Sequence, residues 1–481
     1  MVWIPPRMLI PVLSSIFLFS PSFGDRLVAF LHPPSSGLAD LKWQVDLIQG
    51  GQMHSGFEPI MCPHSWNALI APARTLSLRV CAWVIISLLS SLPIESRAAD
   101  VIANDSVGGG FELGSHLSCN GQWHTLAAVD PAMQQGDYDS LNAVSALTPA
   151  DVWAVGQFHV FSGTGYDQTL AEHWDGAQWT LVPTPTPLKP ISVLNGVAAI
   201  GSRDVWAVGY EQDVGVSSPY LSLIEHWDGN AWTIVQNGTY DAYLTSVSAF
   251  ASDDIWAVGT TNFPGLGVIE HWDGNTWTYM NLTVAEFRAV TAIAHDDVWV
   301  VGQNYAANGN ENSLAIHYDG AKWTQFPTPN PLMKHPGCDE NWLTSIAAIS
   351  SADIWATLVA RDTDFGILDH TFAVHWDGNT WRLGRTQNPG GKSMYNDLWA
   401  SAALADNDVY AVGETGQITF VPLAERWDGN GWALVTTPSL QGVLLALTRV
   451  PTRTALFATG NQVVQNSYNG TLVEYVCPAA K

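Results

Sequence analysis

Short apolar segments alternate with turn residues in a repeating pattern from Leu141 to the end of the chain. One full copy reads LTSVSAF from Leu244, DIWAVGT from Asp254, GVIEHWD from Gly267 and TWTYM from Thr276. Short segments that are apolar or alternating and end at turn residues are typical of β-strands, and no segment of the unit has a helical period. The pattern therefore predicts a repeating unit of four strands.

Two sequence blocks fix the register of this unit. The first, D[VI]WAVG or a close variant, begins at Asp151, Asp204, Asp254, Asp297, Asp353 and Asp408. The second, HWDG..W, carries His173, His226, His271, His317 and His375, with Arg426 in the sixth copy. First blocks are 43 to 56 residues apart, which suits a four-stranded propeller blade of about 40 to 50 residues.

A seventh unit is divided between the two ends of the repeat. After the sixth copy, Leu445 and Phe457 take the leucine and tryptophan positions, and TLVEYVC from Thr471 resembles a third strand. Its fourth strand matches CNGQWHTL from Cys119, which precedes the first copy. We therefore predict an all-β, seven-bladed β-propeller with four antiparallel strands per blade, whose last blade is closed by an N-terminal strand.

This alignment places Cys477 at the end of a third strand and Cys119 just before the fourth. We predict a disulfide between them, which in the chain-entropy model contributes about 4 to 5 kcal/mol. The alternative is two free thiols, and Cys338 is expected to have no partner.

The first hundred residues differ from the repeat. Arg74 and Arg79 precede VCAWVIISLLSSL, and SRAAD ends in small residues near Ala99, which indicates a secretory signal over about residues 61–99. Residues before it are interpreted as an over-extended start, and an uncleaved anchor is the alternative. We expect a signal region at 1–99, a linker at 100–113, and a propeller at 114–481 without a stable membrane span. A secreted, periplasmic or cell-surface location follows.

The negative net charge of the chain argues against one class of partner. With 19 Lys+Arg against 44 Asp+Glu the formal net charge is -25. Nucleic-acid binding requires clustered cations to neutralise phosphates, so this composition argues against it. We expect a monomer whose partner is a glycan or an extracellular or periplasmic protein.

The six copies of D[VI]WAVG…HWDG..W resemble bacterial exported propellers of the galactose-oxidase/kelch-like superfamily over about residues 114–481. They resemble tectonin-type and fucose-lectin propellers less closely. The kelch diglycine is absent from the strands, and no constellation maps onto the copper site of galactose oxidase.

The repeated histidine and aspartate look catalytic at first sight. An active site is needed once, however, whereas a scaffold bond is needed in every blade. The resemblance to the His-Asp-Trp networks of WD40 blades implies a structural role, with the block aspartate as the partner of the histidine. Of the 23 tryptophans, 17 occupy repeat positions, so they are expected to pack between blades.

Loop lengths indicate where a ligand binds. The links between first and second strands and between third and fourth strands are uniformly short, so all length variation falls on the opposite face. Candidate ligand-binding residues there are Trp399, Trp342, Arg288, Tyr305, Tyr210, Tyr243 and Tyr395. No cofactor is expected. RDTDFGILD offers Asp362, Asp364 and Asp369 as candidate calcium ligands, and HPGCDENW, from His335 to Trp342, is expected to be a polar loop without metal-ligand spacing.

Two classes of function remain open. The first is a non-catalytic exported binding module that recognises a glycan or a protein through the long-loop face. The second is a polysaccharide hydrolase or lyase with carboxylates at the channel mouth, although no acid, base and nucleophile set stands out. Fold alone does not separate them.

Overall fold

The structure is a computed structural model that describes residues 117–478 except 132–136, 162–164, 215–217, 263–264, 308, 332–338, 363–366, 452–454 and 464–468. It also describes an N-terminal antiparallel sheet of β1 (Ile16–Phe17), β2 (Val28–His32), β3 (Gln44–Gln49) and β4 (Gln52–His54), which belongs to a separate compact unit. The predicted signal region and linker fall largely or wholly outside the described residues.

The described part of the second unit is almost entirely β-structure. Its only helical element is the short η2 (Gly391–Ser393), and no described helix is long and apolar enough to cross a membrane. The strands recur as antiparallel groups of four, in the order that the alternation of apolar segments and turns predicts.

First strands of the groups are β6 (Tyr138–Thr148), β10 (Ile191–Gly201), β14 (Tyr243–Ala251), β21 (Asp339–Ser350), β25 (Tyr395–Ala405) and β29 (Val443–Arg449). Second strands are β7 (Asp151–His159), β11 (Asp204–Gln212), β15 (Asp254–Thr260), β18 (Asp297–Tyr305), β22 (Asp353–Asp362), β26 (Asp408–Gly416) and β30 (Leu456–Val463).

Third strands are β8 (Asp167–Trp174), β12 (Tyr220–Trp227), β16 (Leu266–Trp272), β19 (Glu311–Tyr318), β23 (Ile367–Trp376), β27 (Phe420–Trp427) and β31 (Asn469–Val476). Fourth strands are β9 (Trp179–Leu181), β13 (Trp232–Asp241), β20 (Trp323–Phe326), β24 (Trp381–Arg385) and β28 (Trp432–Leu434). We number the groups that begin with β6, β10 and β14 units 1 to 3, and those that contain β18, β22 and β26 units 4 to 6.

One strand serves two units. β17 (Trp277–Ala294) runs without interruption from the outer edge of unit 3, where it pairs with β16, to the inner edge of unit 4, where it pairs with β18. The sequence pattern predicted two strands with a break between them. Extended backbone continues here because Asn281 to Ala285 contain no proline or glycine to interrupt it.

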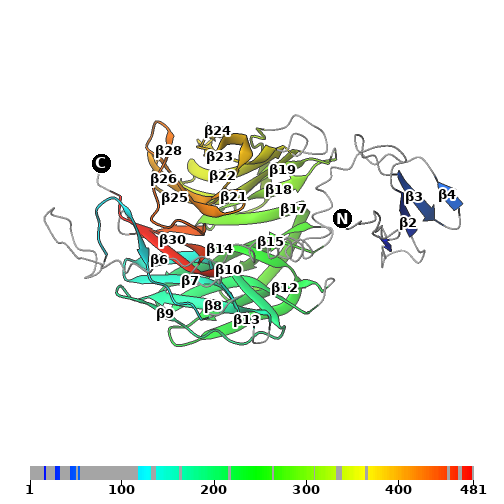
Figure 1. Ribbon diagram of the computed structural model, residues 1–481. Coiled ribbons are helices and arrows are strands. Elements are labelled where there is room, and N and C mark those ends of the chain that lie inside the picture. Colours follow the sequence, from blue (N-terminus) through cyan, green and yellow to red (C-terminus); the bar gives the residue numbers. More distant parts are fainter. Residues whose placement is uncertain are drawn as a thin grey trace, which may run out of the picture. The chain divides into compact units, whose positions relative to one another are not determined.

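The first strands contact one another in a cycle. β6 contacts β10, β10 contacts β14, and the contacts continue through β17, β21, β25 and β29 back to β6. In Figure 1 the red β30 accordingly lies beside the cyan β6, so the last strands of the chain meet the first unit. Sheets that radiate from a ring of inner strands are typical of a β-propeller.

The core lies between neighbouring sheets. Trp153 of unit 1, for example, packs against Trp227 and Trp232 of unit 2, with ring centroids 5.0 and 5.4 Å apart. Trp153 and Trp232 are buried together with Leu194 in one cluster. Large aromatic side chains at repeat positions therefore bury apolar area between units.

Two sequence assignments are corrected by the strand register. Leu444 pairs with Gly460 as Leu398 pairs with Gly413, so Leu444 and not Leu445 takes the leucine position. The two adjacent leucines made both registers acceptable by hydrophobicity. The predicted HPGCDENW loop also ends earlier than expected, because Asp339 already begins β21.

The N-terminal strand β5 (Trp123–Leu126) pairs antiparallel with β31. Trp123 lies opposite Val476, in the place that Trp179 occupies opposite Trp174 in unit 1. Next to this strand pair, Cys119 and Cys477 are joined by a disulfide, which is the pair expected from the alignment.

Candidate functional site

The repeated aspartate-glycine pairs form tight turns at the short-link end of the units. Asp175 accepts hydrogen bonds from the backbone N–H groups of Ala177 and Gln178 at 2.8 and 2.9 Å, and these bonds lower the pKa of its carboxyl. Gly176 has φ +94°, a conformation that side chains other than glycine rarely adopt. The aspartate-glycine motif thus forms the turn of the hairpin between the third and fourth strands.

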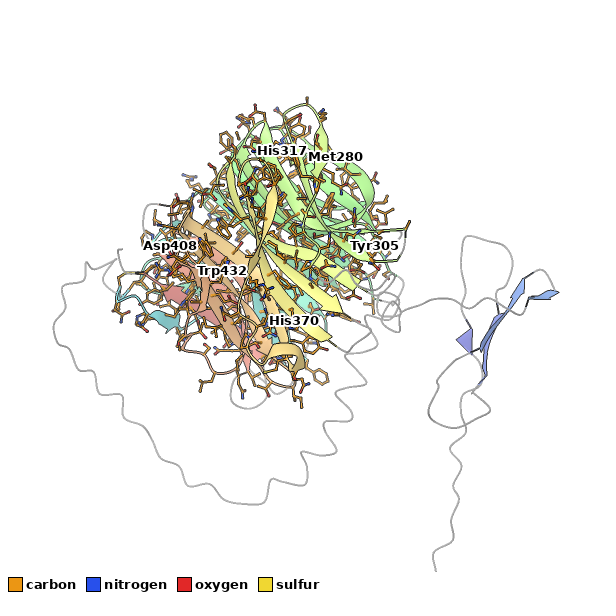
Figure 2. All side chains as sticks on the ribbon, turned by 90° about the horizontal axis from the view of Figure 1, so that it is seen from above. Met280, Tyr305, His317, His370, Asp408 and Trp432 are labelled. Carbon is orange, nitrogen blue, oxygen red and sulfur yellow. A yellow bond between two sulfur atoms is a disulfide. The ribbon has the colours of Figure 1, made fainter. Side chains whose placement is uncertain are left out.

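The repeated histidines are paired within their own units. In units 1 to 5 the Nε2 atom of the histidine lies 2.8 to 2.9 Å from an oxygen of the block aspartate. Unit 6 replaces the histidine by Arg426, which donates two hydrogen bonds to Asp408. The same pair therefore recurs around the ring, as a scaffold bond would. Figure 2 labels His317 at this end of its unit and Tyr305 at the other.

A cavity of about 550 Å³ lies along the axis of the ring. Each first strand contributes the residue that follows its buried leucine or phenylalanine; these residues are Asn142, Asn195, Thr245, Arg288, Thr344, Trp399 and Leu445. Three residues after the leucine position, Val144, Val197, Val247, Val290 and Ile346 make a deeper, apolar layer. The polar layer lies nearer the start of the first strands, which is the long-loop end.

Four of the seven predicted ligand-binding residues line this cavity. They are Trp399, Arg288, Tyr210 and Tyr243. The Tyr210 and Tyr243 rings stack with centroids 4.6 Å apart, and burial raises the pKa of both hydroxyls. Trp399 is half-buried, and its Nε1 donates to Glu414 at 3.3 Å.

The other three predicted residues are not part of the cavity wall. Trp342 is buried, 6% exposed, and the guanidinium groups of Arg288 and Arg361 lie 5.8 and 5.2 Å from the centroid of its ring. Tyr305 is 40% exposed and donates to Glu286. Tyr395 lies near Phe420, with centroids 6.3 Å apart.

A cluster of carboxyl groups adjoins the cavity in units 4 to 6. It consists of Glu286, Glu311, Glu340, Asp369, Asp397 and Glu414, and we call it the acidic arc. Asp397 is paired with Glu414 in the strand register, and Glu311 with Glu340. Like charges placed directly opposite one another destabilise a sheet. These pairs therefore do not stabilise the fold, in contrast to the repeated histidine-aspartate pairs.

Two arginines lie within the arc and already have partners. Arg288 donates to Gln303 at 2.9 Å and lies 3.5 Å from Glu286. Arg361 donates to both oxygens of Asp369, at 2.5 and 2.7 Å, and to Glu340 at 2.9 Å. Of the six carboxyl groups, Glu286, Glu340 and Asp369 therefore have a guanidinium partner.

Burial and mutual repulsion hold protons on part of the arc. Burial, and next the charge of Glu340, raise the pKa of Glu311 to about 7. Burial, followed by the charges of Asp369 and Glu414, raises the pKa of Asp397 well above its usual range. Burial also raises the pKa of Glu414. Carboxyl groups with such perturbed pKa values gather at functional sites more often than elsewhere.

The calcium candidate is only partly covered by the structure. Asp364 and the side chain of Asp362 lie outside the described residues. Asp369 is described, and both of its carboxylate oxygens are engaged by Arg361. Within the described ranges no group of three or more His, Cys, Asp or Glu residues is arranged to hold a metal ion.

Sequence reasoning missed most of the arc. Glu311 and Glu414 occupy positions that hold unrelated residues in other units, and the position shared by Glu286 and Asp397 is acidic in those two units only, so the search for repeats passed over all four. One signal was present, because Val193 and Tyr243, which line the cavity in units 2 and 3, correspond in register to Glu286 and Asp397. A comparison of the residues at this one position in all units would have identified Glu286 and Asp397 as acidic exceptions.

Comparisons with known proteins give only distant likenesses. No protein-family model matches the chain, and no curated protein matches it. The solved structures that resemble it include the WD40 β-propeller domain of Doa1 (11% identity, TM-score 0.43, covering 71% of this chain and 97% of that one). The six-bladed, fucose-recognising Aleuria aurantia lectin also resembles it (13%, 0.40, 63% and 97%). A third is a protein of unknown function from Dyadobacter fermentans DSM 18053 (10%, 0.45, 74% and 97%).

Proposed function

We propose that the protein is an exported binding propeller that recognises a glycan at the long-loop mouth of its central cavity. The observation that carries this proposal is the composition of the cavity wall. Trp399, Tyr210 and Tyr243 supply aromatic faces, and Asn142, Asn195, Thr245 and Thr344 supply amides and hydroxyls. A sugar presents C–H faces to aromatic rings and hydroxyls to such polar groups, and a cavity of this size suits a small ligand.

The proposed frame is a seven-bladed ring. Units 1 to 6 supply six blades, and β29, β30 and β31 together with β5 make the seventh. The antiparallel pairing of β5 with β31 and the cyclic contacts of the first strands support this closure. A closed ring leaves no open sheet edge at its ends, which keeps the mouth residues of different blades in fixed positions.

Glycan-array binding of the purified protein tests the function, with and without calcium. Saturable binding that Trp399→Ala abolishes and Trp399→Phe largely retains is the expected result. Tyr395→Ala is the matched control, because Tyr395 lies on the same strand outside the cavity wall, and it should bind normally. Binding that is unchanged in Trp399→Ala would contradict the proposal, and dependence on calcium would instead favour the Asp362, Asp364 and Asp369 site.

A polysaccharide hydrolase or lyase is the second candidate. The raised pKa of Glu311, at about 7, and the neighbouring carboxyl groups of Glu340 and Glu286 favour it, since general acids in such enzymes carry raised pKa values. Release of new reducing ends from a bound polysaccharide would decide for this class. Binding to a protein without any glycan affinity would exclude both candidates.

Export is proposed from the sequence, and the disulfide between Cys119 and Cys477 is compatible with an oxidising compartment. N-terminal sequencing of the protein recovered from the medium or periplasm should yield a peptide that begins near Asp100. An N-terminus within residues 1–60 would contradict the predicted signal cleavage.

A further inference from the structure

We propose that the acidic arc binds a protonated amine, so that the ligand at the cavity mouth is an amino sugar rather than a neutral one. This inference rests on the proposed glycan-binding function and names the chemical class of the sugar. It follows from the charges of the arc, from one buried carboxylate oxygen and from the position of the arc beside Trp399.

The charge balance of the arc is the first observation. Both guanidinium groups are committed, Arg288 to Glu286 and Gln303, and Arg361 to Glu340 and Asp369. No described cation forms an ion pair with Glu311, Asp397 or Glu414. Since ionised carboxyl groups that are buried without a countercharge are costly, part of the arc keeps its protons, and a further positive charge at this place would stabilise the ionised form.

The carboxyl group of Asp397 supplies the second, independent observation. It is only 4% exposed, and its Oδ1 atom has no hydrogen-bond partner among the described residues. The groups that act on this carboxyl are Asp369, Glu414 and Arg361, so it faces into the arc. A buried acceptor without a donor is rare in folded proteins, and an amine with three N–H donors would satisfy it.

The arc is positioned to act on the same ligand as the aromatic wall. Asp397 precedes Trp399 by two residues on β25, and Glu414 accepts the Trp399 indole N–H. Tyr243 and Val193, which correspond to Asp397, line the cavity, whereas Asp397 itself lies outside its wall and reaches it through Glu414 and Trp399. A sugar ring packed against Trp399 would therefore hold a substituent close to Asp397 and Glu414.

A metal ion fits these observations less well than an amine. In the described parts of the chain, no group of three or more His, Cys, Asp or Glu residues is arranged to hold a metal ion. Asp369, which could have joined Asp397 as a ligand, is occupied on both oxygens by Arg361. An amine needs only two or three acceptors in its neighbourhood.

Calorimetric titration of the full chain with three tetrasaccharides tests the inference. The probes are β-1,4-linked glucosamine, its N-acetylated counterpart and β-1,4-linked glucose, at about pH 6, where the amines are protonated. We expect the glucosamine tetramer to bind about ten-fold or more tightly than either neutral tetramer. Asp397→Asn and Glu414→Gln should remove this preference. Asp213→Asn is the matched control, because Asp213 is an exposed loop carboxylate paired with Lys189 outside the arc.

The outcomes separate the two proposals. Equal binding of all three tetramers would overturn the amine site and leave glycan binding intact. If no tetramer binds, titration with spermidine decides. Saturable spermidine binding that is lost in Asp397→Asn would keep the amine site and overturn the glycan function, whereas no binding of any probe would overturn both. Circular dichroism and the melting temperature verify that each variant is folded, and Glu311→Gln replaces any variant that is not.

Discussion

Asp254 carries more of the scaffold network than its counterpart Asp151. Its Oδ1 accepts from Trp256 Nε1 at 2.7 Å and lies 2.8 Å from His271 Nε2, while Oδ2 lies 2.6 Å from His295 Nδ1. Among the described residues, the side chain of Asp151 contacts His173 alone. Each hydrogen bond to a charged group contributes about 1.5 to 3 kcal/mol at most, and less where water competes.

Replacement of these two aspartates should therefore have unequal effects. Asp254→Ala is expected to lower the free energy of unfolding by about 2 to 3 kcal/mol and Asp151→Ala by about 1 kcal/mol, because the first leaves several donors unpaired in a more buried place. Urea denaturation followed by tryptophan fluorescence measures both. Equal losses would show that the additional contacts of Asp254 contribute nothing.

In the acidic arc we expect the opposite effect of replacing an aspartate: the variant should be more stable than the natural protein. Asp397→Asn removes a buried carboxyl group that lies directly opposite Glu414 in the sheet, and so relieves repulsion between like charges. Its melting temperature at about pH 8, where the carboxyl is increasingly ionised, should exceed that of the natural protein. A lower melting temperature would mean that Asp397 serves the fold rather than a ligand.

Strands were predicted well where a local signal exists and less well where tertiary context decides. The limits of β14, β15 and β16 agree with the predicted segments to within one residue, because Asp-Gly turns and the D[VI]WAVG block mark their ends. The continuous β17 was missed because residues 281–285 carry neither a turn signal nor a strong strand signal. The predicted strand register was wrong at Leu445, because the adjacent Leu444 is equally hydrophobic and is the residue that takes the leucine position.

The closing strand gives a prediction at the scale of the element. Removing the disulfide with Cys119→Ser and Cys477→Ser should lower the free energy of unfolding by about 6 kcal/mol in the chain-entropy model, somewhat more than the value expected from the sequence, because the bond joins residues 358 apart. Urea midpoints with and without reductant measure the loss. The double variant should not respond to reductant, and Cys338→Ser should behave like the natural protein. An unchanged midpoint in the double variant would mean that β5 closes the sheet without covalent help.

Several units of the ring carry a buried glutamate at one position of the third strand. Glu172, Glu225 and Glu425 precede the repeated histidine or arginine, and all three are fully buried. Burial is the main cause that raises the pKa of Glu172 and Glu225 to about 8 and that of Glu425 to about 7. Units 4 and 5 have Ile316 and Val374 at the same position, so the fold does not require a carboxyl there.

Stability should consequently fall as the pH rises. In the unfolded chain these glutamates ionise near their ordinary pKa of 4.5, whereas in the folded chain they keep their protons until about pH 7 to 8. Between these values the folded state binds more protons than the unfolded state. The stabilisation is therefore complete below the unfolded pKa and is lost as the pH passes through the folded pKa. Urea midpoints should decrease from about pH 5 to about pH 9.

Single variants test whether the buried glutamates cause this decrease. Both carboxylate oxygens of Glu225 lack a hydrogen-bond partner among the described residues, so Glu225→Gln and Glu225→Ile should flatten the profile and exceed the natural protein in stability at about pH 9. Asp175→Asn is the control, because its pKa is lowered by turn hydrogen bonds and its contribution is lost only in acid. If the Glu225 variants keep the full slope, the pH dependence of the molecule arises elsewhere, and the acidic arc becomes the first place to examine.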